Sequence, residues 1–295
     1  MNHRFSTLLL REWMQHQRGW LITLLLPPTI FLALLFVGSA EGNPDTSALG
    51  MALIFVMATV GTLLSITWLS AMFQLPGLVR RDNQDRSVEF WLSLPASHSE
   101  SIAAPLLAHA VLMPLAAVLV GYLFGGLISL GLVIKMGGWA AAAAIPWASV
   151  LGLSLPLLLR VLFGVVLLSL WLAPLLLLVL VASAWLKRFG LPAVVLGIGM
   201  SGLLLDKFYG LPIVWQLLQA QQNGALKAML ADPERLHTQL AALDEGSTQA
   251  FHAAAWALQD SLSAVQQLAS PHFIGGLLVA GGGFALLVLK RSRSV

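Results

Sequence analysis

The sequence predicts an all-α polytopic membrane protein, and three observations lead to this fold class. Of the 295 residues, 58% are hydrophobic and only 10% are charged, whereas a soluble domain carries roughly 25% charged residues. The mean hydropathy is +0.85. The apolar residues gather in stretches long enough to cross a bilayer. Because one globule cannot bury so much apolar surface, most of it must face lipid.

We predict six transmembrane helices, because polar or basic residues separate six long apolar stretches. These cover approximately residues 19–39, 48–78, 102–134, 161–186, 191–205 and 273–289. The adjacent Pro27 and Pro28 should kink the first span. This first stretch is too long for the apolar region of a signal peptide, so we expect it to remain in the membrane.

The basic residues predict the orientation, since loops on the cytoplasmic side carry an excess of lysine and arginine. With the N-terminus inside, eleven of the sixteen basic residues fall in inner segments: Arg4, Arg11, Arg18, Arg80, Arg81, Arg86, Lys187, Arg188, Lys290, Arg291 and Arg293. The outer segments hold Lys135, Arg160, Lys207, Lys227 and Arg235. We therefore expect a multi-pass protein of the cell inner (cytoplasmic) membrane with both termini in the cytoplasm.

The N-terminal segment, residues 1–18, predicts an amphipathic helix that lies along the inner headgroups. Its apolar stripe consists of Phe5, Leu8, Leu9 and Trp13, and its charged and polar residues fall elsewhere: Arg4, Arg11, Glu12, Gln15 and Arg18. Such a helix anchors the chain at the membrane surface. Additional contact with a cytosolic partner is the alternative.

Two outer segments are more than simple loops. Residues 136–159 are rich in alanine and carry two tryptophans, which is typical of an interfacial helix, with a short additional or re-entrant span as the alternative. Residues 207–271 are polar enough to leave the bilayer. Apolar residues at helical spacing in 213–230 and 250–268 predict an external insertion of two or three amphipathic helices, with breaks near Asn223-Gly224 and Asp232-Pro233. We expect this insertion to pack against the spans, and a substrate gate is the alternative.

The loop between the second and third spans, residues 79–100, has the most distinctive pattern. Asp85 can cap a short helix that starts at Arg86, and Pro95 ends it. The apolar side chains of this helix are Val88, Phe90, Trp91, Leu92 and Leu94. Ser97 and Glu100 then have the spacing of a capping box for the third span. A helix lying at the interface is the alternative, because Trp and Phe favour that depth.

Two stretches carry a family resemblance. Asp85-Arg86-Ser87, Phe90-Trp91 and Ser93-Leu94-Pro95 resemble the signature loop of ABC-2 type permeases, the membrane subunits of one class of ATP-binding-cassette (ABC) transporters. Trp171-Leu172-Ala173-Pro174 and Ser183-Ala184-Trp185-Leu186-Lys187-Arg188 resemble the fourth span of the same subfamily. The inner N-terminal helix, the six spans and the insertion before the last span also fit, although residues 207–271 match no known pattern.

The resemblance implies a single transmembrane permease domain, residues 1–295, whose coupling helix is seated in a groove of a separate ABC ATPase (nucleotide-binding) subunit. The residues implied in coupling are Asp85, Arg86, Ser87, Val88, Glu89, Phe90, Trp91 and Leu92. Because the family works as two membrane subunits with two ATPase subunits, we expect a homodimer or a pair with a paralogous permease. The family also implies export.

The sequence supports a separate ATPase. A Walker A loop needs a Gly-Lys pair to hold the phosphates, and this pair does not occur in the chain. We therefore expect the chain not to be an enzyme and to bind no cofactor, with ATP and Mg²⁺ held by the partner subunit. Because the spans lack a charged lining, a hydrophobic or amphipathic cargo is favoured.

A rhomboid-like intramembrane serine protease is the alternative function. Gly199-Met200-Ser201-Gly202 and His272-Phe273-Ile274-Gly275 match its Gly-x-Ser-Gly and His-x-x-Gly patterns, so Ser201 and His272 would form the dyad. Against this, residues 207–271, which lie between them, are too polar for the span that separates serine and histidine in rhomboids. Close helix packing explains the small residues near Ser201 equally well.

Other chemistries have weaker support. The seven histidines show no His-Glu-x-x-His pair and no close ligand spacing, so we expect no metal site. His109 alone lies deep in an apolar run, where a packing role or a role in the pathway is open. Carboxylates lie in loops or at span ends, which disfavours a proton- or sodium-driven transporter. The scattered basic residues give no support for nucleic-acid binding.

Overall fold

The computed structural model describes residues 2–38, 48–84, 97–244 and 252–293, and every regular element in these ranges is helical. This confirms the all-α class. Five helical stretches among the described residues are long and apolar enough to cross a membrane: Arg4–Leu34, Leu49–Gly77, His98–Ala144, Trp147–Tyr209 and Pro271–Arg293. The chain is therefore built as a membrane-embedded protein. The predicted fifth span, residues 191–205, lies within the fourth of these stretches.

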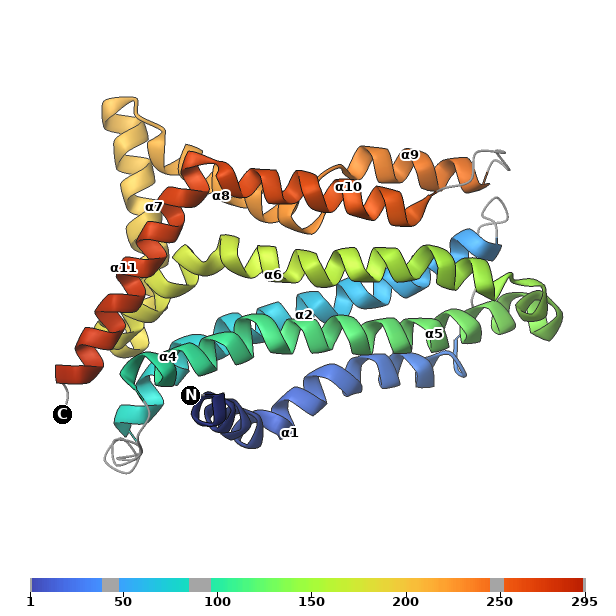
Figure 1. Ribbon diagram of the computed structural model, residues 1–295, viewed down its shortest axis with the longest axis horizontal. Coiled ribbons are helices and arrows are strands. Elements are labelled where there is room, and N and C mark those ends of the chain that lie inside the picture. The colour runs from blue at the N-terminus through green and yellow to red at the C-terminus, as the bar shows by residue number, and fades with distance from the viewer. Residues whose placement is uncertain (1, 39–47, 85–96, 245–251, 294–295) are drawn as a thin grey trace.

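The described residues form a series of helices. In order they are α1 (Asn2–Leu34), α2 (Ala48–Gln84), α4 (His98–Leu107), the π-helix η1 (Ala108–Leu112), α5 (Met113–Ala144), α6 (Trp147–Leu186), η2 (Lys187–Phe189), α7 (Gly190–Tyr209), α8 (Ile213–Met229), α9 (Pro233–Asp244), α10 (Ala253–Gln266), η3 (Gln267–Ala269) and α11 (Pro271–Arg293). Helices α2, α5 and α6 run along the long axis of the molecule, and α8, α9 and α10 lie on one side of α6 (Figure 1).

The centre of the bundle lies between α2, α5 and α6. Its buried side chains are Val60, Leu64, Val118, Leu158 and Val165. Gly121 and Gly125 on α5 let α2 approach closely, because a Cβ at either position would lie 2.9 Å from the backbone of Val60 or Val56. Small residues four apart are a common way of bringing membrane helices together.

The long helices exceed the thickness of a bilayer. Helix α2 has 37 residues and α6 has 40, which corresponds to about 55–60 Å at 1.5 Å per residue. A hydrocarbon core is about 30 Å thick, and even a tilt of about 40° does not absorb the difference. Part of the bundle must therefore lie outside the hydrocarbon layer.

Residues 136–159 differ from the prediction of a separate interfacial or re-entrant helix. The first part continues α5 to Ala144, across a kink at Gly138 with φ of 72°, and the second part is the beginning of α6. Ile145 and Pro146 form the turn between the two helices. Proline cannot continue the preceding helix, but it can begin the next one, so the segment is divided at this point.

The described part of residues 207–271 contains three α-helices, α8, α9 and α10, and the short η3. Helix α9 begins at the predicted break before Pro233. The predicted break near Asn223 and Gly224 is wrong, since α8 continues through both residues. Gly224 is there for packing, because a Cβ at this position would lie 2.2 Å from the ring of Trp171 on α6.

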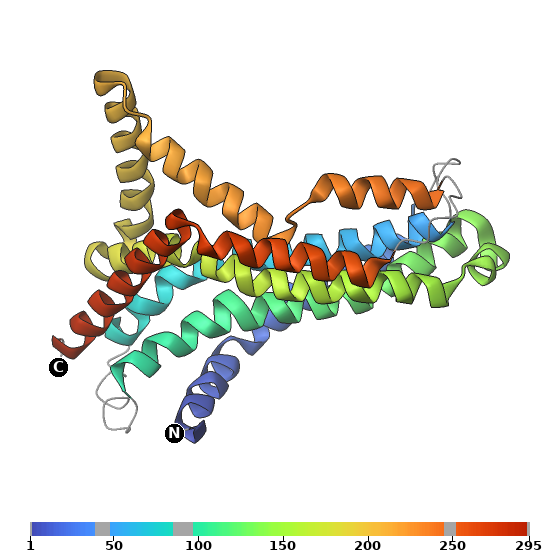
Figure 2. The same cartoon turned by 45° about the horizontal axis from the view of Figure 1, so that its top comes forward.

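Helices α7 and α8 form a V that projects from the bundle (Figure 2). The turn between them starts at Gly210, whose φ of 64° is in the left-handed region and whose N–H donates to the carbonyls at the end of α7. Glycine is the usual residue at this helix-ending position. Apart from Gly190 and Gly202, the residues of α7 are not buried in this chain, so this helix offers most of its surface to its surroundings.

A π-turn interrupts the third membrane-crossing stretch. In η1 the N–H of Met113 donates to the carbonyl of Ala108, five residues back. Pro114 follows and has no N–H to donate to the carbonyl of Ala110. The hydroxyl of Ser169 on α6 lies 2.6 Å from this carbonyl oxygen and 2.8 Å from that of Val165. Ser169 thus replaces the donor that the proline removes.

The replacement of Ser169 by alanine is expected to destabilise the protein by about 1–3 kcal/mol, because the buried Ala110 carbonyl loses this donor. Ser261→Ala is the control, since the Ser261 hydroxyl donates to Ala257 of its own helix, at 2.7 Å. The thermal midpoint in detergent measures both variants. Equal midpoints for the two variants would contradict this role of Ser169.

Candidate functional site

The predicted coupling segment, residues 85–95, lies outside the described residues. The structure therefore gives no geometry for Asp85, Arg86, Ser87, Val88, Glu89, Phe90, Trp91 and Leu92. It does describe the two helices that the segment joins, since α2 ends at Gln84 and α4 begins at His98. Both of these ends lie at the same end of the bundle as the N-terminal and C-terminal helix ends (Figure 1).

The capping box at the start of α4 is confirmed. Ser97 Oγ accepts the N–H of Glu100 at 3.2 Å, and Glu100 Oε2 accepts the N–H of Ser97 at 2.9 Å. These two bonds satisfy N–H groups that have no partner within the helix. The first turn of α4, next to the end of the coupling segment, is thus held in a defined conformation.

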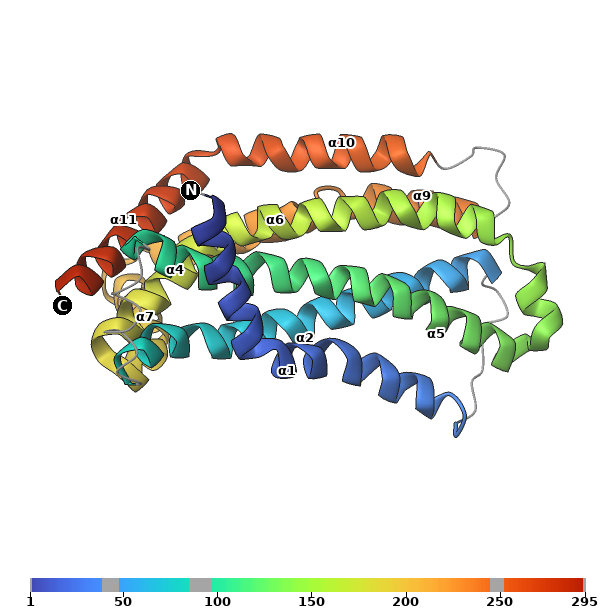
Figure 3. The ribbon, with the colours of Figure 1, turned by 60° about the horizontal axis from the view of Figure 1, so that its bottom comes forward.

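The N-terminal part of α1 crosses α4 at this end of the molecule (Figure 3). Its buried residues are Leu8, Glu12 and Trp20, and His16 is half-buried. These four residues follow one another at intervals of four positions, so they lie on one side of the helix. This corrects the predicted stripe in two places: Glu12 is only 2% exposed, whereas Trp13 is 41% exposed. The helix buries a carboxylate because charged and polar partners surround it.

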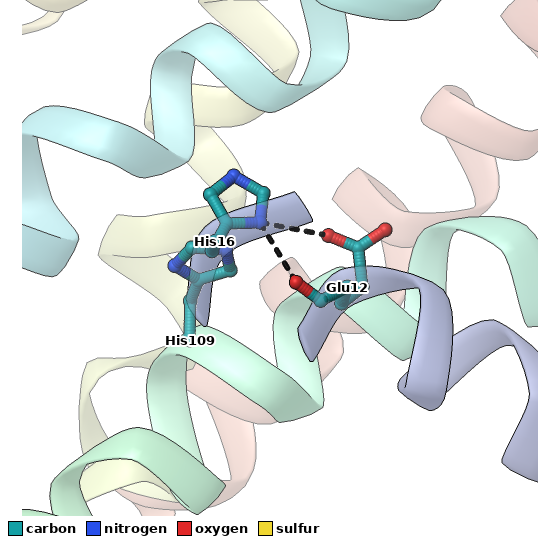
Figure 4. A group of neighbouring side chains, drawn as sticks. All are labelled: Glu12, His16 and His109. Atoms are coloured by element: carbon teal, nitrogen blue, oxygen red, sulfur yellow. Dashed lines mark hydrogen bonds and ion pairs between the residues drawn. The ribbon is translucent and has the colours of Figure 1, made fainter. Parts of the chain in front are cut away.

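The partners of Glu12 come from α1, and a histidine of η1 lies next to them. Arg11 donates to Glu12 Oε1 at 2.6 Å, and Nδ1 of His16 lies 3.7 Å from Oε2 and 3.0 Å from the backbone oxygen of Glu12. His109, on η1, is 1% exposed and places its ring 4.7 Å from that of His16 (Figure 4). We call Glu12, His16 and His109 the inner polar cluster.

Trp20 covers one side of the inner polar cluster. Its ring stacks on His16 at 5.8 Å between centroids and meets His109 edge-on at 5.1 Å. The π-turn at residues 108–112 shifts the register of the third stretch by one residue at His109, and π-turns occur often at functional sites. The cluster was missed in the sequence because only the Glu12-x-x-x-His16 spacing signals it, and His109 is distant along the chain.

A second buried polar site joins α6 to the α8–α10 segment. Nε of Arg160 donates to Asp260 Oδ2 at 2.7 Å, and both side chains are 1% exposed. Arg160 also donates to the carbonyl of Ala228, and Asp260 accepts the N–H groups of Ala231 and Asp232. The sequence placed Arg160 at a span end and gave no partner for it.

The residues of the proposed protease dyad have other partners. Ser201 Oγ donates to the Ile198 carbonyl of its own helix at 3.0 Å. His272 Nε2 lies 3.1 Å from Oε1 of Gln221, and its ring stacks on Trp171 at 6.2 Å between centroids. Gln221 in turn donates to the backbone oxygen of Trp171, three residues before Pro174. This arrangement gives His272 a packing role at the proline-containing part of α6.

A scan against models of known protein families, a search of curated proteins and a search of solved structures each found no match.

Proposed function

We propose that this chain is the transmembrane subunit of an ABC transporter that exports a hydrophobic or amphipathic substrate. The observation that carries the proposal is the ABC-2-like segment, residues 85–95, between two membrane-crossing helices. The ends of these helices lie beside both chain termini (Figure 1). A segment at that position is suited to contact a soluble motor on one side of the membrane.

The orientation in the membrane follows from charge. The termini end of the bundle carries Arg4, Arg11 and Arg18 on α1, Lys187 and Arg188 on η2, and Lys290, Arg291 and Arg293 on α11. By the positive-inside rule this end faces the cytoplasm of the inner membrane. Residues 207–271 then lie on the outer side, and α7 serves as the fifth of six spans.

The energy source is ATP hydrolysis on a separate nucleotide-binding subunit, which holds ATP and Mg²⁺. This chain supplies two elements to the motor, the coupling segment and the N-terminal part of α1 that crosses α4. Helix α2 is a single helix from Ala48 to Gln84, with Pro76 near its Gln84 end. A displacement at Gln84 therefore moves the far end of the bundle, which is how ATP-driven closure of the motor would reach the outer side.

The permease acts as a homodimer or together with a paralogous permease. The exposed apolar surface of α7, with Val195, Leu196, Met200 and Leu203 all more than half exposed, suits contact with lipid or with a second membrane subunit. A cargo that moves between such walls meets Leu, Val, Ala and Met side chains. Hydrophobic and amphipathic molecules match this lining better than sugars or ions do.

Co-purification tests the proposed function. The chain, carrying an affinity tag, is isolated from its own host in mild detergent, and the polypeptides retained with it are identified. We expect a soluble subunit that contains Gly-x-x-x-x-Gly-Lys-Ser/Thr, in equal number to the permease, and an ATPase activity in the complex. An isolated chain that turns over a substrate without ATP, and retains no such subunit, would contradict the proposal.

A further inference from the structure

We propose that the inner polar cluster, Glu12, His16 and His109, binds one divalent transition-metal ion, with Zn²⁺ as the best match. The cluster combines two imidazoles and one carboxylate from two different elements of the fold. One ligand atom from each of the three residues lies within 4.8 Å of the other two. This site is independent of the proposed transport function.

The distances are close to those of a metal site. With zinc bonds of about 2.0–2.2 Å to nitrogen and oxygen, neighbouring ligand atoms lie about 3.3–3.5 Å apart, so side-chain shifts of about 1 Å suffice to enclose an ion. The pair formed by His16 Nδ1 and Glu12 Oε2 is at 3.7 Å. Nδ1 also lies 3.0 Å from the Glu12 backbone oxygen, so binding an ion requires the imidazole proton to move from Nδ1 to Nε2. Glu12 and His16 are one helical turn apart on α1, a spacing that directs both side chains to the same side.

The chemistry of the ligand set also fits. Two histidines and one glutamate form a set found in zinc sites, in which the fourth position is open to water or another ligand. Neutral imidazole and carboxylate suit Zn²⁺ better than Mg²⁺ or Ca²⁺, which prefer oxygen ligands throughout. Glu12 and His109 are 2% and 1% exposed, so bulk water competes little for the ion.

The surroundings hold the ligands in place. Arg11 donates to Glu12 Oε1 and leaves Oε2 for the ion, as the outer partners of ligating carboxylates do. Trp20 contacts both imidazole rings and fixes their planes. The π-turn of η1 sets the position of His109. A bound ion would therefore join the N-terminal part of α1 to the third membrane-crossing stretch.

The test uses the full chain, purified in detergent with a tag that contains no histidine. The protein is equilibrated with Zn²⁺ and passed through a desalting column, and its zinc is measured by mass spectrometry. Co²⁺ serves as a second probe, because its visible bands report the coordination geometry. We expect one zinc per chain and a cobalt spectrum typical of mixed nitrogen and oxygen ligands.

Three variants identify the ligands: Glu12→Gln, His16→Gln and His109→Ala. Removing a residue that only hydrogen-bonds a metal ligand weakens metal binding about 10–100-fold. Removing a ligand itself should therefore weaken binding by about a hundredfold or more. His237→Ala is the matched control, because His237 is exposed on α9 and lies outside the cluster. Glu12→Gln and His16→Gln nearly preserve side-chain size, and thermal unfolding verifies that each variant is folded.

Two results would overturn the proposal. One is a folded wild-type chain with no zinc above the buffer level, which would leave the cluster as an ion pair of Arg11, Glu12 and His16. The other is a loss of zinc from the control His237→Ala as large as the loss from the three ligand variants. The zinc would then be an adventitious ion only. Since neither measurement involves ATP or a partner subunit, both outcomes are distinct from a failure of the proposed transport function.

Discussion

Asp260→Ala is expected to destabilise the protein by about 3–5 kcal/mol, since removing one partner of a buried ion pair leaves the other charge buried and uncompensated. Arg160 has 1% of its side chain exposed, so its guanidinium group cannot reach water while α10 stays packed against α6. Asp260 also accepts two backbone N–H groups at the end of the α8–α9 connection. Its loss should therefore detach α10 from α6 and from this connection together.

The measurement is the thermal midpoint in detergent for the two single variants, Arg160→Ala and Asp260→Ala, and for the double variant. Because the residues act as a pair, the double variant should be less destabilised than the two single changes combined. Asp206→Ala is the control, since Asp206 is exposed on α7. A surface substitution of this kind changes the free energy of unfolding by about 0.5 kcal/mol or less. Additive effects of the two single variants would show that the pair does not act as a unit.

Phe90→Ala with Trp91→Ala is expected to abolish ATP-driven transport while the chain still inserts and folds. Both residues belong to the proposed coupling segment, whose aromatic side chains would fill the groove of the ATPase subunit. A buried aromatic anchor at a protein interface is worth about 2 kcal/mol or more. This corresponds to roughly a thirtyfold loss of affinity for each residue. ATP hydrolysis by the motor should then no longer depend on the cargo.

The matched control for the double variant is Trp139→Ala. Trp139 is 76% exposed and lies on α5 beyond its kink, toward the α5–α6 turn. This turn lies at the opposite end of the bundle from the chain termini (Figure 1). Purified complexes in liposomes give transport and ATPase rates for all three proteins. Normal transport by the Phe90→Ala, Trp91→Ala complex would refute the coupling role.

Local patterns in the sequence predicted the helices and their caps. The Ser97 and Glu100 capping box, the helix start at Pro233 and the all-helical class depend on residues within a few positions of each other, so a single segment contains the necessary information. Likewise, α7 and α8 occupy the predicted ranges closely, because their apolar residues are regularly spaced.

Contacts between distant segments decided the features that the sequence did not predict. Considered by itself, Gly224 predicts a helix break. In the structure the ring of Trp171 packs against this position and leaves no room for a larger side chain, so α8 needs a glycine there. Arg160 and Asp260 are 100 residues apart. The burial of Glu12 depends on His109 and on the path of α1 across α4 (Figure 3). No local spacing carries these pairings.

Photo-cross-linking in native membranes can detect the proposed contact between residues 85–92 and a separate ATPase. A photoreactive amino acid replaces Trp91, the membranes are irradiated, and the attached partner is identified by mass spectrometry. We expect one major product, a soluble polypeptide with a Walker A sequence, which is absent when the probe replaces Trp139. Adducts with lipid alone at position 91 would refute the coupling role and with it the proposed function.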